Sequence, residues 1–253
     1  MENMKWYTGC SGFYYKEWKD SFYPKGLPQS RWFEYYARQF NTLEINNTFY
    51  KFPELKLFEN WYKKAPDGFV FSVKVPGIIT HFKQFKDTET LLNDFYSLAR
   101  EGLKEKLGCI LFQLPPKMSF SLDLIQNIIR QTNMFFKNVI EFRHITWWRK
   151  DVINLLKEQN IIFCGVSYPG LINDVMSHTP VSYYRFHGVP KLYYSLYENS
   201  FLQKVIDGIK AGPSSEAYIY FNNTATGAAI ENAKWVEKYL AGTDEQGTRN
   251  MEL

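Results

Sequence analysis

Three short segments of the chain alternate charged and apolar residues, and this spacing is the clearest sign of chemistry in the sequence. They read LEIN at residues 43–46, VIEFRH at 139–144 and YRFH at 184–187. A period of two places the polar residues of each segment on one face of a β-strand. Carboxylates, guanidinium groups and an imidazole that share a site could bind an anion and carry out general acid–base chemistry on it.

These segments belong to a longer series of strand patterns that alternate with helical patterns. The strand patterns lie at residues 6–10, 42–46, 70–75, 109–114, 138–143, 161–166, 181–187 and 217–222. Most gaps between them carry apolar residues at helical spacing, at 31–40, 55–64, 88–105, 121–129, 151–159 and 229–240. The gap between residues 166 and 181 leaves room for only a short helix, because it contains Pro169, Gly170 and Pro180.

The alternation of strands and helices, with no linker between them, predicts a parallel sheet with crossover helices. Eight strands in 253 residues predict a single TIM-type (β/α)8 barrel over residues 1–242, followed by a polar tail at 243–253 that frays. An open doubly wound sheet is the alternative. It has less support because no Gly-x-Gly-x-x-Gly motif follows the first strand.

The active site of such a barrel lies at the C-terminal ends of its strands, so the last inward-facing residues should meet there. We expect Glu44, Glu141 and His187 to be the acid–base groups. The residues expected to bind the substrate are Asn46, Lys74, Gln113, Arg143, Arg185, Asn222 and Asn223. Three cations against two carboxylates favour a phosphate- or carboxylate-bearing ligand. A polar plug in which these charges neutralise one another is the structural alternative.

Other chemistries have weaker support. No strand end carries Asp and no His-x-His pair occurs, so a catalytic divalent metal is a minor alternative without assigned ligands, and no cofactor is predicted. Lys74 as a Schiff-base lysine would need neighbouring charges to lower its pKa. We expect His144 to point away from the mouth of the barrel, and His81 lies in a long loop where it could cover the site.

The composition limits the class of protein. The net charge is +4, and no Lys/Arg cluster reaches the density of a nucleic-acid-binding arm. No apolar run approaches the roughly 18 residues of a membrane span, and the N-terminus lacks the apolar core of a signal peptide. The three widely spaced cysteines fit a cytoplasmic protein. Aromatic residues make up 18% of the chain, which predicts packing between helices and barrel, with stacking surfaces for sugars, bases or cofactor rings as the alternative.

Several motifs together resemble a known family. They are GCSGF at residues 9–13, LEINNTFY at 43–50, FSVKVP at 71–76, FQLPP at 112–116, EFRH at 141–144, YRFHG at 184–188 and YFNN at 220–223. This set is similar to that of the domain of unknown function 72 family, also called YecE-like. The resemblance covers nearly the whole chain and implies a single β/α barrel, but no settled activity.

Two positions depart from the pattern of that family. Ser167 stands where an acidic residue is usual, and Thr224 stands where a histidine often follows the two asparagines. If either position is catalytic in relatives, the resemblance implies a changed substrate or an inactive protein here.

The sequence leaves three functional hypotheses. The first is a hydrolase, lyase or isomerase that acts by general acid–base chemistry on a small anionic substrate, nucleotide-like substrates included. It would fail if Arg143 and Arg185 were sealed in ion pairs with no cavity above them. The second is a nucleic-acid-binding or endonuclease-like repair barrel, which requires a broad basic rim around the mouth. The third is a non-catalytic protein that binds a small ligand.

Overall fold

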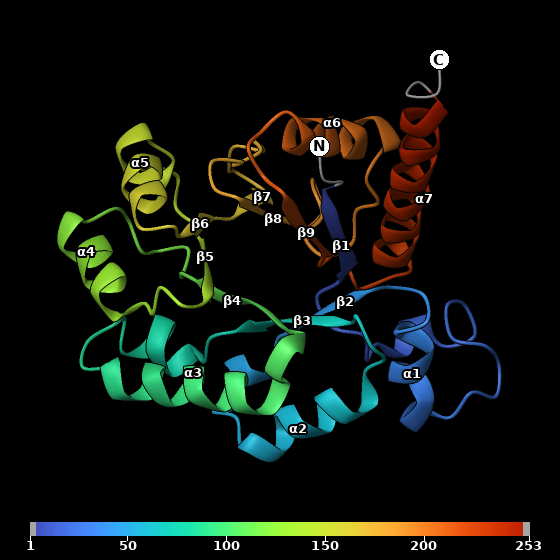
Figure 1. The fold of residues 1–253 in the computed structure, drawn as a ribbon, viewed down its shortest axis with the longest axis horizontal. Coiled ribbons are helices and arrows are strands. Elements are labelled where there is room, and N and C mark those ends of the chain that lie inside the picture. The colour runs from blue at the N-terminus through green and yellow to red at the C-terminus, as the bar shows by residue number, and fades with distance from the viewer. Residues whose placement is uncertain (1–3, 250–253) are drawn as a thin grey trace.

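Nine parallel β-strands form the centre of the molecule, and helices surround them (Figure 1). The computed structural model describes residues 4–249, with side chains described as far as residue 242. The strands are β1 (Lys5–Cys10), β2 (Thr42–Ile45), β3 (Val70–Lys74), β4 (Leu107–Gln113), β5 (Lys137–Glu141), β6 (Ile162–Phe163), β7 (Gly165–Ser167), β8 (Val181–Phe186) and β9 (Glu216–Phe221). Their order, β6-β5-β4-β3-β2-β1-β9-β8-β7, and their parallel pairing confirm the predicted TIM-type barrel, which is nearly closed.

The predicted sixth strand, at residues 161–166, consists of two short strands. β6 pairs with β5 and β7 pairs with β8, and the ladder is interrupted at Cys164. The Cys164 backbone N–H still donates to the Ile140 carbonyl oxygen at 2.9 Å. Ile162, Cys164 and Val166 all belong to the apolar cluster inside the barrel, so the inward–outward alternation continues through the interruption.

The helices cover the outer face of the strands. They are α1 (Trp32–Tyr36), α2 (Leu55–Lys64), α3 (Glu89–Leu103), α4 (Leu122–Gln131), α5 (Lys150–Glu158), α6 (Asn199–Lys210) and α7 (Ala228–Arg249). Helix α6 was not predicted, although one buried face has the i, i+3, i+4, i+7 spacing of an amphipathic helix, at Leu202, Val205, Ile206 and Ile209. Residues 168–180, between β7 and β8, contain no helix.

Helix α7 continues beyond the expected end of the barrel domain at residue 242. It runs to Arg249, so the predicted polar tail at 243–253 begins within this helix, and residues 250–253 lie outside the described residues. None of the helices within residues 4–249 combines the length and the apolar character needed to cross a membrane.

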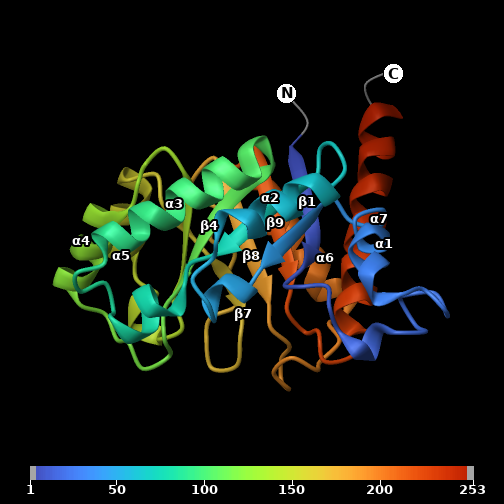
Figure 2. The same ribbon diagram turned by 90° about the horizontal axis from the view of Figure 1, so that it is seen from below.

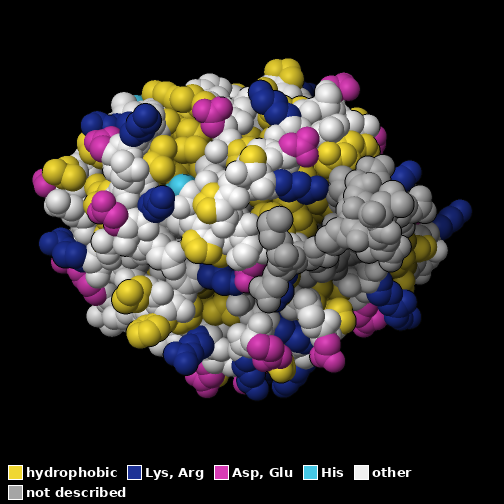
Figure 3. Space-filling view, turned by 45° about the horizontal axis from the view of Figure 1, so that its top comes forward, with side chains coloured by type: hydrophobic (Ala, Val, Ile, Leu, Met, Phe, Trp, Pro, Cys, Tyr) yellow, Lys and Arg dark blue, Asp and Glu magenta, His cyan; other side chains and the backbone are white. Residues whose placement is uncertain are grey.

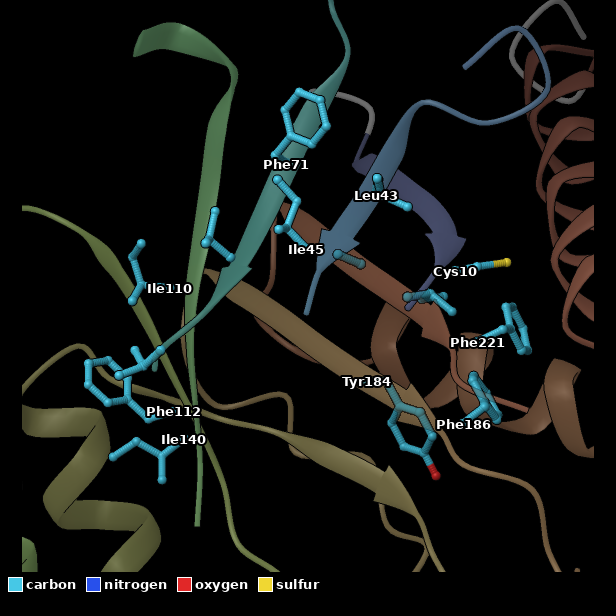
Figure 4. Packing of buried hydrophobic residues seen from close by; sticks show 14 of the residues in the cluster. Cys10, Leu43, Ile45, Phe71, Ile110, Phe112, Ile140, Tyr184, Phe186 and Phe221 are labelled. Atoms are coloured by element: carbon cyan, nitrogen blue, oxygen red, sulfur yellow. The ribbon is translucent and has the colours of Figure 1, made fainter. Parts of the chain in front are cut away.

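Two apolar clusters lie on opposite sides of the barrel wall. The outer cluster fills the space between strands and helices and includes Leu43, Ile45 and Phe186 (Figure 4). The inner cluster lies inside the barrel and includes Tyr183 and Tyr218. Because successive side chains of a strand point to opposite faces, the outward apolar residues leave the polar residues between them pointing into the barrel.

Gly9 permits a close approach between β1 and β2. A Cβ atom at this position would lie 2.2 Å from the carbonyl oxygen of Thr42 and 2.8 Å from the hydroxyl of Tyr36. That hydroxyl accepts from the Cys10 N–H at 2.7 Å and donates to the Thr42 carbonyl at 3.0 Å, so it has little room to move.

We expect Gly9→Ala to lower the free energy of unfolding by roughly 1–3 kcal/mol, because the added methyl group overpacks this contact. Urea denaturation followed by tryptophan fluorescence would measure the change. Gly227→Ala is the control, since a Cβ atom at that position would have nothing within 4 Å, and its midpoint should stay near that of the wild type. Equal midpoints for the two variants would contradict the prediction.

Candidate functional site

A cavity of about 600 Å³ opens at the C-terminal ends of the strands. Because the strands are parallel, the loops that follow them gather at one end of the barrel, which is the lower end in Figure 2. Seven of the ten predicted site residues line this cavity: Glu44, Asn46, Lys74, Gln113, Arg143, Arg185 and Asn222. The structure thus brings together side chains from β2, β3, β4 and β8 and from the residues that follow β2, β5 and β9.

Arg185 is the centre of a buried ion-pair network. Its Nη2 atom donates to Glu44 Oε1 at 2.6 Å, and its Nη1 atom donates to Glu141 Oε2. The Arg185 side chain is 2% exposed and both carboxylates are fully buried. One guanidinium group on β8 therefore neutralises carboxylates on β2 and β5, and holds these three strands together across the barrel.

Arg143 and His187 surround the second carboxylate. Arg143 Nε donates to Glu141 Oε1, and His187 Nε2 lies 3.3 Å from the same oxygen. The ring nitrogen Nδ1 of His187 lies 2.9 Å from Asn222 Nδ2. Glu141 and Asn222 fit a ring that carries its proton on Nε2. Arg143 Nη2, a donor that lies 3.2 Å from the same Nε2 atom, fits the other tautomer.

The environment fixes the protonation of these groups. Burial, together with the nearby Arg143, lowers the pKa of His187 to about 3, so the ring is neutral near pH 7. Burial alone would raise the pKa of Glu141, but the positive charges of Arg143 and Arg185 outweigh it and hold this pKa well below its usual range. Glu141 is therefore an ionised acceptor that positions both arginines.

Lys74 differs from the two arginines. Its Nζ atom donates to Gln113 Oε1 at 2.6 Å and lies 4.1 Å from the centre of the Phe49 ring. Among residues 4–242 it forms no ion pair with a carboxylate. Burial, and then the positive charge of Arg185, lowers its pKa to about 8.

The formal charges of the site leave a positive excess at its surface. Three cations face two carboxylates, and His187 is neutral, which leaves a net charge of 3 − 2 = +1. Because the two arginines are paired with Glu44 and Glu141, the excess charge lies at Lys74, which lines the cavity. The site can therefore attract an anion without breaking an existing ion pair.

Three predicted site residues do not line the cavity. Glu141 and His187 are fully buried behind the arginines that they contact. Asn223 is also fully buried, and its Nδ2 atom donates to the Ser195 carbonyl at 2.9 Å and to Asn232 Oδ1 at 3.0 Å. It ties the loop before α6 to α7, a structural role that the sequence did not suggest.

The two histidines outside the network have local partners. His144 accepts from the Thr146 N–H at 3.4 Å and caps the short helix Ile145–Trp147, and it does not line the cavity. His81 lies in the short helix Ile78–Phe82 and contacts the hydroxyl of Thr80 and the edge of the Phe49 ring. It does not line the cavity.

Several contributors to the site were not identified from the sequence. Tyr183 donates its hydroxyl to Glu44 Oε2 at 2.6 Å, and the Tyr168 ring lies 4.2 Å from the Arg143 guanidinium carbon. Tyr183 precedes Arg185 by two positions, so the alternation could have placed it inward. Thr224 lines the cavity, whereas Ser167 is fully buried and accepts from the Tyr197 hydroxyl at 2.9 Å.

The described residues around the cavity do not form a recognisable metal site. Within the described part of the chain, His, Cys, Asp and Glu nowhere form a group of three that could hold a metal ion. The three cysteines, Cys10, Cys109 and Cys164, are free and buried.

Comparison with known proteins gives a consistent family but no activity. The family model described as "Protein of unknown function DUF72" matches residues 7–252. The chain is 25% identical to the UPF0759 protein YecE of Escherichia coli over 64% of this chain and 61% of that protein, which is less than two thirds of its length. It is 23% identical to the UPF0759 protein YunF of Bacillus subtilis over 87% of this chain and 90% of that protein.

Solved structures show the same fold. A DUF72 family protein from Thermotoga maritima superimposes with a TM-score of 0.84 at 29% identity, covering 94% of this chain and 99% of the other. A DUF72 family protein from Enterococcus faecalis gives a TM-score of 0.79 at 18% identity, covering 93% and 95%. The match to the family model extends over nearly the whole chain, and the chain therefore belongs to the DUF72 family of proteins of unknown function.

Proposed function

We propose that this protein is an enzyme that binds a small anionic substrate in the cavity and acts on it by general acid–base chemistry, with Lys74 as the central group. The observation that carries the proposal is the position of Lys74, a nearly buried ammonium group that faces a cavity without a carboxylate partner among the described side chains. A buried cation is costly unless it is paired, so an anionic ligand would supply the missing charge.

The geometry supports a division of roles different from the one that the sequence suggested. Both terminal nitrogens of Arg185 are engaged by Glu44 and Glu141, so this residue is better placed to position carboxylates than to hold a substrate. Glu141 and His187 are positioning residues in this proposal, because neither reaches the cavity. Glu44 borders the cavity, but it is fully buried and both of its oxygens accept hydrogen bonds, Oε1 from Arg185 and Oε2 from Tyr183, so it too is a positioning residue. Lys74 is therefore the group that would exchange a proton with the ligand.

The ionisation of Lys74 suits both parts of this role. Below about pH 8 the amine is protonated and attracts the anion, and near pH 8 a fraction is neutral and can accept a proton. Anion affinity should therefore fall as the pH rises through this range.

Nucleic-acid binding is the second candidate function. A nucleic-acid-binding barrel needs a broad basic surface around its mouth. Figure 3 shows the other end of the molecule, where the strands begin, and there Lys and Arg side chains are interspersed with Asp and Glu. No specific observation favours this second hypothesis over the first.

A thermal-shift screen against phosphorylated and carboxylated metabolites would test the proposal. A ligand present at about 100 times its dissociation constant should stabilise the protein by about 2.7 kcal/mol. We expect Lys74→Met to lose this shift. Lys117→Met is the matched control, because Lys117 is an exposed lysine shortly after β4 and does not line the cavity.

Four outcomes would decide between the candidate functions. A shift that survives in Lys74→Met, or disappears equally in Lys117→Met, would refute the role of Lys74. Turnover of the bound ligand by the wild type would support an enzyme, and saturable binding without turnover across the panel would support the ligand-binding alternative instead.

A further inference from the structure

Aromatic side chains form the part of the cavity wall that faces solvent. The aromatic lining residues are Phe13, Tyr14, Tyr15, Tyr50, Trp61 and Tyr193. Three of them are exposed to an extent unusual for large rings: Tyr50 at 86%, Tyr14 at 54% and Tyr193 at 42%. Most of the other aromatic residues of the chain pack against one another in the outer core. The exposed rings at the cavity are therefore candidates for contact with a ligand.

One exposed ring, and the backbone of another exposed tyrosine, are held in place before any ligand binds. The Tyr14 hydroxyl donates to Gln29 Oε1, and its ring packs against Trp32 with 5.2 Å between ring centres. The backbone of Tyr193 donates to the His187 carbonyl at 2.6 Å and accepts from the Ala225 N–H at 3.1 Å. Because its ring is fixed, Tyr14 would lose little conformational freedom on binding.

The aromatic wall is directly connected to the cation of the site. The Phe49 ring lies 4.1 Å from Lys74 Nζ, and the Tyr50 ring stands perpendicular to Phe49, with 5.3 Å between ring centres. Two adjacent residues therefore join the charged end of the cavity to its aromatic end. A ligand that fills the cavity would meet positive charge at one end and ring faces at the other.

Polar atoms without partners are found in the same cavity. Ser11 is 1% exposed, and its hydroxyl oxygen is buried without a hydrogen-bond partner. Asn46 Oδ1 and Arg185 Nε, which belong to two other lining residues, are also buried without one. Buried polar atoms are usually paired, so these three would suit hydroxyl groups of a ligand.

We propose that the substrate belongs to the mononucleotide class: a phosphate at Lys74, a hydroxylated sugar beside Ser11 and Asn46, and a planar base against Tyr14, Tyr50 and Tyr193. The position of the phosphate depends on the function proposed above, whereas the ring-binding wall is supported by separate observations. A cavity of about 600 Å³ lies within the range that holds ligands of this size.

Titration calorimetry with four kinds of probe tests the proposal: ribose 5-phosphate, adenosine 5′-monophosphate, uridine 5′-monophosphate and adenosine. Stacking of a base on an aromatic side chain should make at least one nucleotide bind about tenfold more tightly than ribose 5-phosphate. Tyr50→Ala should remove most of this difference, and Tyr50→Phe should keep it. Both changes should leave the fold intact because Tyr50 is 86% exposed.

A matched variant controls for the loss of any exposed ring. Phe135 is 89% exposed and lies just before β5, at the opposite end of the barrel, so Phe135→Ala should leave all four affinities unchanged. If neither nucleotide binds more tightly than ribose 5-phosphate, or if Tyr50→Ala leaves the difference unchanged, the ring-binding proposal is overturned.

The probes also separate this proposal from the function on which it depends. Binding of ribose 5-phosphate that requires Lys74, with no gain from a base, would leave the anion site standing and refute the aromatic subsite. Binding of adenosine that requires Tyr50, with no effect of Lys74→Met on any probe, would support the aromatic subsite and refute the anion site. Absence of binding by all four probes would overturn the mononucleotide class.

Discussion

Arg185→Met is expected to lower the free energy of unfolding by roughly 3–5 kcal/mol, because it removes the charge that two buried carboxylates share. Arg185 is the common counter-ion of Glu44 and Glu141, and all three side chains are buried. Methionine fills much of the same space but leaves Glu44 without an ion-pair partner and Glu141 with Arg143 as its arginine. Urea denaturation at pH 7, followed by tryptophan fluorescence, would measure the loss.

Lys74→Met provides the contrasting variant. It removes a cation from the same end of the barrel, but that cation is paired with no carboxylate of the described residues, and its lowered pKa reflects a folded state that disfavours the charged form. We expect this variant to be at least as stable as the wild type. A stable Arg185→Met, or a Lys74→Met that is equally destabilised, would contradict the view that ion pairing separates these residues.

The stability of Lys74→Met decides how a loss of ligand binding in this variant is interpreted. A residue that lowers the stability of the fold and forms no ion pair with a carboxylate is typical of a site kept for binding or catalysis. If Lys74→Met is folded and stable, loss of ligand binding by this variant can be assigned to the missing amine.

The second large effect is an acid-induced loss of stability caused by His187. Its folded pKa is about 3, lowered by burial and by Arg143, against an ordinary value of 6.5. Between these values the unfolded chain binds a proton that the folded chain does not, so stability falls as the pH decreases from 6.5. Over the full interval the loss from this one group is of the order of 4 kcal/mol.

His187→Gln isolates this contribution. Glutamine does not titrate, so the stability of the variant should depend less steeply on pH between about 4.5 and 6.5 than that of the wild type. His81, whose pKa is lowered to about 4 chiefly by burial, acts in the same direction but is present in both proteins. Glu141, whose folded pKa is depressed, loses its contribution only at lower pH. Parallel pH profiles for the two proteins would disprove the assignment.

The barrel and the inward residues could be predicted because alternation reports directly on strand faces. Leu43 and Ile45 pack outward and Glu44 points inward, as the LEIN pattern indicated. The same rule placed Lys74 and Arg185 correctly. Helix α6 was missed although its apolar spacing was present in the sequence.

The pairing of the charges could not be predicted in the same way. Alternation says which face a residue occupies, but not how deep it lies along the barrel axis or which distant strand faces it. Arg185 and Glu44 are 141 positions apart, and their contact depends on the order of the strands. Depth explains why Glu141 shares the inward face with Arg143 and yet remains hidden behind it.

The interruption at Cys164 marks the place where the strand ladders of the barrel can open most easily. The ladders on either side of it are short, since β6 contributes two residue pairs to β5 and β7 contributes three to β8. Loss of one of these ladders would turn the ring into an open sheet that exposes the edge of β5 or of β8, and such edges recruit strands from other chains. The helix-free segment 168–180 is anchored beside this position by the hydrogen bond from the Tyr184 hydroxyl to the Asn173 carbonyl. We expect the docking of this segment to help keep the two short ladders paired.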